Sequence, residues 1–319
     1  MLRTRAAVAA LALCALGPAG CAGTLESLGA ALAYRHAPLS AENVRLDLPY
    51  RIDAAAHPDK HRLDLFLPAG EAAADGGWPT LLFVHGGGWT EGDRATRVLG
   101  IEPMRNIGRF YAARGIGVAV VGYRLQPQVS WREQVDDVAQ ATAWVHREIA
   151  ARGGDPDALY LAGHSAGAWL AAWVGLDDAA LARAGMDRSS LCGLVLVSGA
   201  GYDMLDAQTY ALGAKRAYYE RLFGDDDPDW AQAASILAHL DAPLPPTLVL
   251  SGAKEPPKFR RQGDLLFDAL LSHGGRAQRE VLAEQDHQRI VISMSRSGDP
   301  VSDAILAFLD ATTCPAGSP

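Results

Sequence analysis

The chain has 319 residues, of which 49% are hydrophobic and 21% charged, and 29 Lys and Arg against 37 Asp and Glu give a formal charge of −8. This composition is too hydrophobic for a disordered chain, and four cysteines are too few for a disulfide scaffold of this length. The mild acidity, without a basic run, argues against nucleic acid and against an anionic membrane surface as partners. A globular body with a sizeable core is therefore expected.

The first 20 residues have the organisation of an export signal. Arg3 and Arg5 form a short basic region, residues 6–16 (AAVAALALCAL) are uncharged and apolar, and small residues then precede Cys21. This ending resembles a bacterial lipobox, although Pro18 stands where an aliphatic residue is usual. We expect a lipid-anchored chain that starts at Cys21 in the bacterial periplasm or cell envelope; signal cleavage without lipidation and an uncleaved N-terminus are the alternatives.

After a linker over residues 21–43, short apolar runs alternate with longer helical patterns as far as residue 310. Strands are expected at residues 44–51, 61–67, 80–85, 117–123, 158–163, 191–198, 247–252 and 276–283. The later runs are continuously apolar (LLFV, VAVV, LVLV), which is typical of strands buried on both faces. Because no helical pattern separates the first two strands, we expect them to form an antiparallel hairpin at one edge of the sheet.

Helical patterns lie in several of the intervals between the other strands. Residues 131–151 carry apolar side chains at helical spacing behind Ser130, a suitable N-cap, and residues 166–176, 259–272 and 300–309 behave similarly. Strand–helix alternation requires crossover connections. It predicts one α/β domain over residues 44–310, with a mainly parallel eight-stranded sheet covered by helices on both faces. A flexible tail is expected at 311–319.

The segment from residue 199 to residue 246 interrupts the alternation of strands and helices, because it contains no pattern typical of a strand. Aromatic side chains gather there: Tyr202, Tyr210, Tyr218, Tyr219, Phe223 and Trp230. Long insertions of this kind are usually functional lids or binding loops. We expect a small cap at about residues 200–245, and a partly ordered surface excursion is the alternative.

The strongest local signal is GHSAG at residues 163–167, which follows the apolar run LYLAG and opens a helical pattern. On a strand–turn–helix junction the turn is so sharp that the positions flanking Ser165 require glycine. The strained turn would hold the Ser165 hydroxyl out at the carboxyl edge of the sheet. An incidental serine in a glycine-rich turn is the alternative.

The second signal is HGGGW at residues 85–89, directly after the run TLLFV. Consecutive glycines let the backbone fold back and aim N–H groups at one point, which is what the oxyanion of an acyl-transfer transition state needs. A phosphate-binding loop is disfavoured, because no Lys-Ser/Thr pair follows and no GxGxxG motif opens a helix here.

Together the two motifs resemble those of α/β-hydrolases of the hormone-sensitive-lipase-like esterase group, near bacterial carboxylesterases and the kynurenine-formamidase-like branch. The resemblance extends over roughly residues 44–310. It includes Gly92-Asp93 after HGGGW, the Tyr-Arg…Pro stretch at 123–127 and GGDP at 153–156.

The resemblance implies an oxyanion hole formed by the backbone N–H groups of Gly87, Gly88 and Ala166. The sequence departs from the family at Gly122, because the family often has Asp before the Tyr-Arg pair. The contact that this acid would make is therefore missing or replaced.

A serine hydroxyl needs a positioned base, and in this fold the triad follows in the order Ser, acid, His. His287 lies just after the last strand, where the family places its base; a solvated loop histidine beside Asp286 is the alternative. His164, inside the GHSAG motif, is expected to shape the turn.

The triad acid is expected within a few residues of the strand at 247–252. Glu255 is the only acidic residue there, at a position where the family usually has Asp. A glutamate is able to hold His287 in the required tautomer and to stabilise its cationic form. Asp264 and Asp286 are the alternatives.

The predicted reaction is acyl transfer from a small-molecule carboxylic ester, through an acyl-enzyme on Ser165. No cofactor and no metal are expected, because no cluster of His, Cys or Asp has ligand spacing. Trp89 and the aromatic insertion predict a mostly apolar substrate pocket, which by analogy with the family favours short to medium acyl chains.

Other activities on the same fold remain open. A formamidase or related amidase would use the same residues, a serine peptidase would usually carry a large additional domain, and a non-catalytic surface protein would normally have lost part of the machinery. Cys192 and Cys314 are not expected to be catalytic, and a disulfide between them cannot be assigned from the sequence. The oligomeric state is not predicted either.

Overall fold

The computed structural model describes residues 37–69, 76–98, 101–224 and 227–314. The expected export signal and Cys21 lie outside the described residues, as do residues 22–36 of the expected linker. No helix in the described part of the chain is long and apolar enough to cross a membrane.

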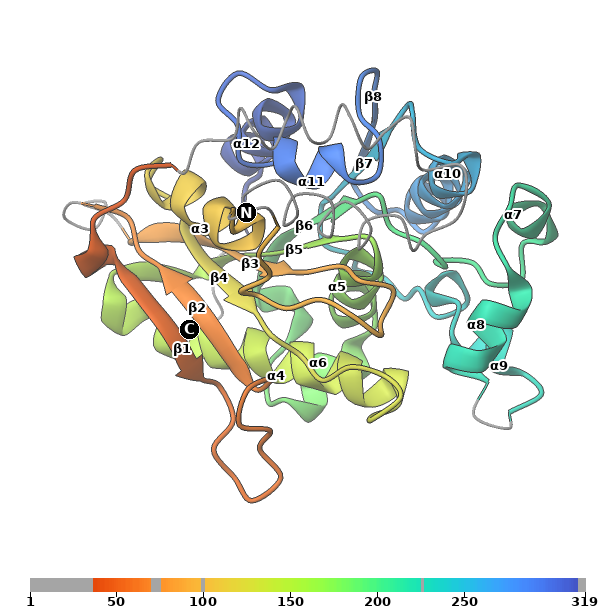
Figure 1. Ribbon diagram of the computed structural model, residues 1–319, viewed down its shortest axis with the longest axis horizontal. Coiled ribbons are helices and arrows are strands. Elements are labelled where there is room, and N and C mark those ends of the chain that lie inside the picture. The colour runs from red at the N-terminus through yellow and green to blue at the C-terminus, as the bar shows by residue number, and fades with distance from the viewer. Residues whose placement is uncertain (1–36, 70–75, 99–100, 225–226, 315–319) are drawn as a thin grey trace, which may run out of the picture.

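Eight strands form one sheet in the order β1-β2-β4-β3-β5-β6-β7-β8 (Figure 1). β2 pairs antiparallel with both β1 and β4, and all other neighbours pair in parallel. The predicted hairpin and the mainly parallel sheet are thus confirmed. The strands are β1 (Val44–Pro49), β2 (Arg62–Phe66), β3 (Trp78–Val84), β4 (Gly117–Val121), β5 (Gly154–His164), β6 (Leu191–Val197), β7 (Thr247–Gly252) and β8 (Ala277–Leu282).

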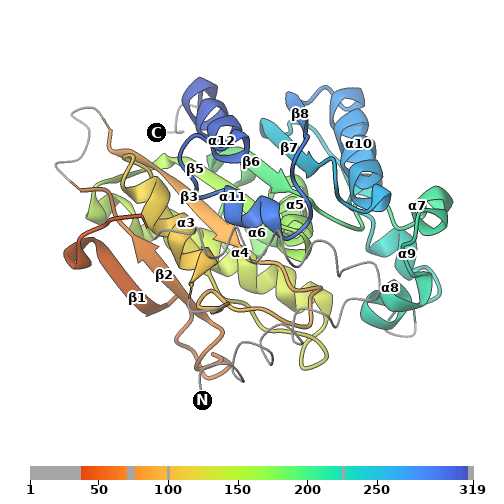
Figure 2. The same ribbon diagram turned by 45° about the horizontal axis from the view of Figure 1, so that its top comes forward.

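Helices cover both faces of the sheet, and alternate strand residues divide between two cores (Figure 2). In β3, Leu82 and Val84 face the core under α4 (Trp131–Glu148), α5 (Ala166–Leu176), α6 (Asp178–Arg183) and α10 (Pro257–Ser272). Leu81 and Phe83 face the core under α3 (Pro103–Ala112), α11 (Arg289–Ser293) and α12 (Pro300–Ala311). This is the α/β-hydrolase arrangement that the sequence predicted.

The long helix α4 begins where the sequence predicted. The Ser130 side chain accepts a hydrogen bond from the Glu133 N–H, and the Glu133 carboxylate accepts one from the Ser130 N–H, which completes a capping box. The helix ends at Glu148 and a short 3-10 turn, Ala150–Arg152, continues the expected segment.

The insertion between β6 and β7 contains no strand among its described residues. It folds as short helices beside α10, namely α7 (Ala207–Ala211), α8 (Arg216–Phe223) and α9 (Trp230–Ala233) (Figures 1 and 2). Tyr219 and Phe223 of α8 are buried in the same core as α4 and α5. The insertion is therefore packed onto the body on the side of the sheet that carries α5.

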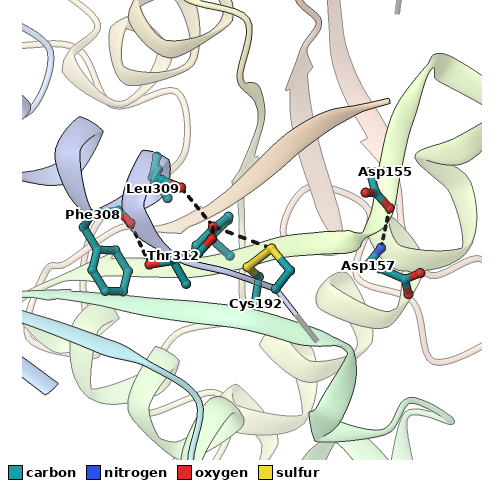
Figure 3. The surroundings of a disulfide bond; sticks show 8 residues. Asp155, Asp157, Cys192, Phe308, Leu309 and Thr312 are labelled. Carbon is teal, nitrogen blue, oxygen red and sulfur yellow. Dashed lines mark hydrogen bonds between the residues drawn. A yellow bond between two sulfur atoms is a disulfide. The ribbon is translucent and has the colours of Figure 1, made fainter. Parts of the chain in front are cut away.

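A disulfide joins Cys192, which is fully buried on β6, to Cys314 beyond the end of α12 (Figure 3). The Tyr160 hydroxyl on the neighbouring strand donates a hydrogen bond to the Leu309 carbonyl, 3.1 Å away. Of the flexible tail expected at 311–319, Ala311 belongs to α12 and Cys314 is bonded to the sheet, and residues 315–319 lie outside the described residues.

Replacing Cys314 by serine is expected to lower the free energy of unfolding by about 2–4 kcal/mol. The bond spans 122 residues, so its loss releases a long loop in the unfolded chain. Urea unfolding of the variant and the oxidised wild type measures the difference. Reduction of the wild type should reproduce the loss and leave Cys314→Ser unchanged; equal midpoints for all forms would contradict the prediction.

Candidate active site

Ser165 lies between the end of β5 and the first residue of α5, at the carboxyl edge of the sheet. Its backbone has φ 55° and ψ −121°, an uncommon conformation for a residue with a side chain. The Ser165 N–H donates to the Val197 carbonyl at 2.9 Å, which ties the turn to the end of β6. The hydroxyl is therefore held at a strained, half-buried turn.

The glycines on either side of Ser165 make this turn sterically possible. A Cβ at Gly163 would come within 2.2 Å of the Gly167 carbonyl oxygen, and a Cβ at Gly167 within 2.2 Å of the Val84 carbonyl oxygen. Any side chain at either position would require the backbone to move. Gly167 also brings the start of α5 against the end of β3, so the GHSAG and HGGGW motifs meet at this point.

His287 follows β8 and reaches Ser165 across the sheet edge. Its Nε2 lies 2.9 Å from Ser165 Oγ, within hydrogen-bond distance for proton transfer from the hydroxyl. The Phe259 ring stacks on the imidazole with 4.0 Å between ring centroids. The ring of His287 is thus fixed on one face by the first turn of α10.

The His164 side chain contacts the backbone of His287. Its Nε2 lies 2.9 Å from the His287 carbonyl oxygen, so this nitrogen carries the proton and donates. Burial, followed by the neighbouring His287, holds the pKa of His164 well below its usual value, and the ring is neutral at pH 7. The structure therefore gives His164 a second contact, to the backbone of His287, besides its place in the turn.

Glu255 is the carboxylate that the structure brings to His287. It is buried, and its Oε1 lies 3.5 Å from His287 Nδ1. The Ser198 hydroxyl donates a hydrogen bond to the same oxygen. A distance of 3.5 Å is longer than a hydrogen bond, but contacts of this kind are often long before substrate binds.

Neither alternative acid approaches His287 Nδ1. Asp264 pairs with Arg279 at 3.1 Å on the outer side of α10. Asp286 accepts hydrogen bonds from the N–H groups of Gln288 and Arg289, and so stabilises the turn in which His287 lies.

In the glycine loop that follows β3, the carbonyl groups of Gly86 and Gly87 accept hydrogen bonds from neighbouring residues. The His85 ring donates through Nδ1 to the Gly86 carbonyl at 2.8 Å, and the N–H groups of Thr90 and Glu91 donate to the Gly87 carbonyl at 3.2 and 2.9 Å. In a trans peptide the C=O and the following N–H point in opposite directions. The N–H groups of Gly87 and Gly88 are thereby directed away from these partners.

The N–H groups of Gly87, Gly88 and Ala166 donate to no acceptor within the described ranges of the chain. Gly87 has φ 124°, and a Cβ there would lie 2.0 Å from the Glu91 carbonyl oxygen, so only glycine fits. Three free donors near a nucleophile are what an oxyanion hole requires.

His85 is neutral because it is buried. Burial lowers its pKa to about 4, its ring stacks on Tyr123 with centroids 4.4 Å apart, and the Tyr123 hydroxyl donates to the His85 carbonyl at 3.0 Å. A neutral ring with its proton on Nδ1 is the form that holds the Gly86 carbonyl.

The low pKa of His85 predicts loss of stability in acid. The unfolded chain binds a proton near pH 6.5 and the folded chain only near pH 4, so this contribution is complete above pH 6.5 and is lost as the pH falls toward 4. Between pH 7 and 5 the free energy of unfolding should fall by about 2 kcal/mol from this group. Urea unfolding at both pH values measures the change, and His85→Asn should show a shallower slope. Equal slopes would contradict the prediction.

Trp89, expected to contact substrate, is instead buried, with 2% of its surface exposed. Its indole packs edge-on against Trp169, Tyr219 and Phe223, with centroids 5.6, 6.0 and 5.0 Å away. Trp89 therefore joins the glycine loop to α5 and to the insertion, and its side chain does not form an open substrate surface.

Arg94 lies beside Gly122, the position at which the sequence departs from the family. A Cβ at this position would lie 3.1 Å from an Arg94 guanidinium nitrogen. Arg94 pairs instead with Asp47 of β1 and with Asp64 of β2, the latter at 3.4 Å. The arginine beside Gly122 is thus paired with carboxylates from the antiparallel edge of the sheet.

No group of three or more His, Cys, Asp or Glu with the geometry of a metal site occurs among the residues that the structure describes. Two contacts at this site were not anticipated: the stacking of Phe259 on His287, and a hydrogen bond of 2.9 Å from the Tyr218 hydroxyl to the Gly88 carbonyl. The aromatic content of the insertion was the available signal for Tyr218, and no motif marked Phe259.

The family model named BD-FAE matches residues 63–270 of this chain. An isoprenylcysteine alpha-carbonyl methylesterase of Arabidopsis thaliana is 28% identical over 266 residues, which cover 79% of this chain and 60% of the relative. Esterase LipQ of Mycobacterium tuberculosis is 28% identical over 238 residues, which cover 72% of this chain and 55% of the relative. The chain thus spans between half and two thirds of the length of these curated relatives.

Among solved structures, esterase B from Lactobacillus rhamnosis superposes with a TM-score of 0.67 at 24% identity, covering 92% of each chain. An esterase from Pyrobaculum calidifontis superposes with a TM-score of 0.68 at 20% identity, covering 89% of this chain and 90% of the other. These similarities show that the fold is shared.

Proposed function

The chain belongs to the BD-FAE family, and on that premise we propose that it is a serine hydrolase that cleaves carboxylic esters through an acyl-enzyme. The observation that carries the proposal is the 2.9 Å contact between Ser165 Oγ and His287 Nε2 at a strained strand–helix turn. The buried carboxylate of Glu255 behind the imidazole and the free N–H groups of the glycine loop support it.

In the proposed reaction His287 Nε2 takes the proton of the Ser165 hydroxyl as Oγ attacks the ester carbonyl. The N–H groups of Gly87, Gly88 and Ala166 stabilise the oxyanion, and each donor of this type typically contributes about 2.7–4 kcal/mol to lowering the barrier. His287 then protonates the leaving alcohol, and water, activated by the same imidazole, hydrolyses the acyl-enzyme. Glu255 orients His287 and stabilises its cationic form.

The proposed substrates are small-molecule esters with short to medium acyl chains. Support comes from the close packing of the insertion, in which α8 lies over Trp89 and the Tyr218 hydroxyl reaches the Gly88 carbonyl. One relative is named as an isoprenylcysteine alpha-carbonyl methylesterase, which supports an ester as the substrate class. An amidase remains the alternative, since it would use the same residues.

Hydrolysis of p-nitrophenyl acetate, p-nitrophenyl butyrate and an aryl formamide by the purified protein tests the proposal. Faster turnover of the two esters is expected, together with covalent labelling of Ser165 by an alkyl phosphonate, located by peptide mass spectrometry. A strong preference for the formamide would reassign the protein to the amidases. No turnover of any of the three would overturn the hydrolase proposal.

We further propose that the protein is exported and lipid-anchored at Cys21. Besides the signal-like residues 1–20, the Cys192–Cys314 disulfide supports export, because such bonds persist mainly in oxidising compartments. The mass of the N-terminal peptide of the protein isolated from bacterial membranes reports the modification. An unmodified peptide beginning at Ala22 would contradict the anchor.

A further inference from the structure

The four carbonyl groups of residues 86–89, in the glycine loop, accept hydrogen bonds from different parts of the chain. Those of Gly86 and Gly87 accept hydrogen bonds from donors within residues 85–91. That of Trp89 accepts from the Gln126 N–H at 3.0 Å and from Gln134 Nε2 at 2.8 Å. The Gly88 carbonyl accepts from the Tyr218 hydroxyl, 2.9 Å away. Among these four carbonyls, it alone is held by the insertion within the described chain.

The peptide group between Gly88 and Trp89 has an orientation that places Trp89 in an unfavourable backbone conformation. Trp89 has φ 64°, in the left-handed region that costs a residue with a side chain about 1–2 kcal/mol. Rotation of this one peptide by about half a turn changes ψ of Gly88 and φ of Trp89, and would return Trp89 to negative φ. Gly88 has no Cβ to resist such a rotation. The observed orientation therefore needs a partner for the Gly88 carbonyl.

Tyr218 is well placed to be that partner. An ideal Cβ on Gly88 would lie 2.6 Å from the Tyr218 hydroxyl oxygen, so the approach depends on the glycine. The Tyr218 ring is half-buried, packs edge-on against Tyr219 at 5.7 Å and has the Arg221 guanidinium 5.4 Å from its centroid. Burial also raises the pKa of Tyr218, which keeps the hydroxyl protonated and able to donate.

We propose that Tyr218 is a positioning residue of the oxyanion loop: its hydroxyl holds the Gly88–Trp89 peptide, and thereby keeps Gly88, whose N–H lies in the adjoining peptide, in the conformation that accepts an oxyanion. The inference rests on the proposed function. It makes the insertion part of the catalytic geometry, because a residue of α8 sets the conformation of a loop that follows β3. Tyr218 acts through Gly88 and does not itself contact the reacting atoms.

The test is Tyr218→Phe, which removes the hydroxyl and keeps the ring. Its kcat for p-nitrophenyl butyrate should fall about tenfold, the factor expected for the loss of one hydrogen bond, while KM stays within about twofold. The matched control is Tyr210→Phe, which removes a hydroxyl that donates to the Met204 carbonyl at 2.7 Å inside the same insertion. The control should keep the kcat of the wild type.

Phenylboronic acid gives a second readout that needs no turnover. Ser165 Oγ bonds to boron, the hydroxyl proton passes to His287, and the resulting tetrahedral anion has an oxygen where the oxyanion would lie. Its Kd, from isothermal titration calorimetry, should rise about tenfold in Tyr218→Phe and stay unchanged in Tyr210→Phe.

Each outcome bears on the inference. Unchanged kcat and unchanged boronate affinity in Tyr218→Phe would overturn it, as would equal losses in both variants, which would indicate a general effect of the insertion's packing. Boronate binding that weakens in Tyr218→Phe, in a protein that hydrolyses no ester, would support the inference and contradict only the proposed function. Absence of boronate binding by the wild type would overturn the inference itself.

Discussion

Replacing Ser165 by alanine is expected to lower kcat for p-nitrophenyl butyrate by about 10⁶-fold, to the rate that binding and the oxyanion loop alone provide. The reason is chemical: in the proposed reaction the Ser165 hydroxyl oxygen becomes acylated, and no other hydroxyl in the described chain contacts Nε2 of His287. Initial rates at saturating ester measure kcat.

The Ser165→Ala variant should fold as the wild type does. Alanine keeps the Cβ, so the cost of φ 55° at this turn is the same, and only a hydroxyl on a half-buried side chain is lost. Its urea midpoint should match that of the wild type, and its phosphonate labelling should vanish. A variant that retained more than about a hundredth of the wild-type kcat would contradict the assignment of Ser165.

The sheet could be read from the sequence because most of its strands are continuous apolar runs. β7 has the predicted bounds and the other seven strands differ by at most a few residues. α3 was missed: it has Gly108 in its middle, which reads as a weak helix position. In the fold that glycine is required, since a Cβ would lie 2.1 Å from the Phe66 ring. Close packing against the sheet outweighed local propensity here.

The candidate site could be predicted where a residue's position along the chain determines its place in the fold. Ser165 follows β5 and Glu255 follows β7, and parallel strands bring their carboxyl ends to one edge. Contacts that depend on tertiary packing could not be found this way. Phe259 stacks on His287, and Trp89 turns inward to the core, because of how α10 and the insertion are packed.

The assignment of Glu255 as the triad acid can be tested directly by substitution. Replacing Glu255 by glutamine is expected to lower kcat by about 10³–10⁴-fold. An amide that donates to Nδ1 would leave the His287 proton on Nε2, and that nitrogen could then no longer accept the proton of Ser165. The Ser198 hydroxyl donates to the same Oε1 that faces Nδ1, so in the variant it would face the amide nitrogen and accept from it instead.

The matched control for Glu255→Gln is Asp286→Asn, which neutralises the carboxylate next to His287 in sequence. The asparagine oxygen is able to accept the same hydrogen bonds from the Gln288 and Arg289 N–H groups, so the turn should persist and kcat should stay within about threefold of the wild type. A large loss in Asp286→Asn together with near-normal turnover in Glu255→Gln would transfer the role to Asp286. The 3.5 Å approach of Glu255 to Nδ1, compared with the turn contacts of Asp286, is the physical reason to expect the opposite result.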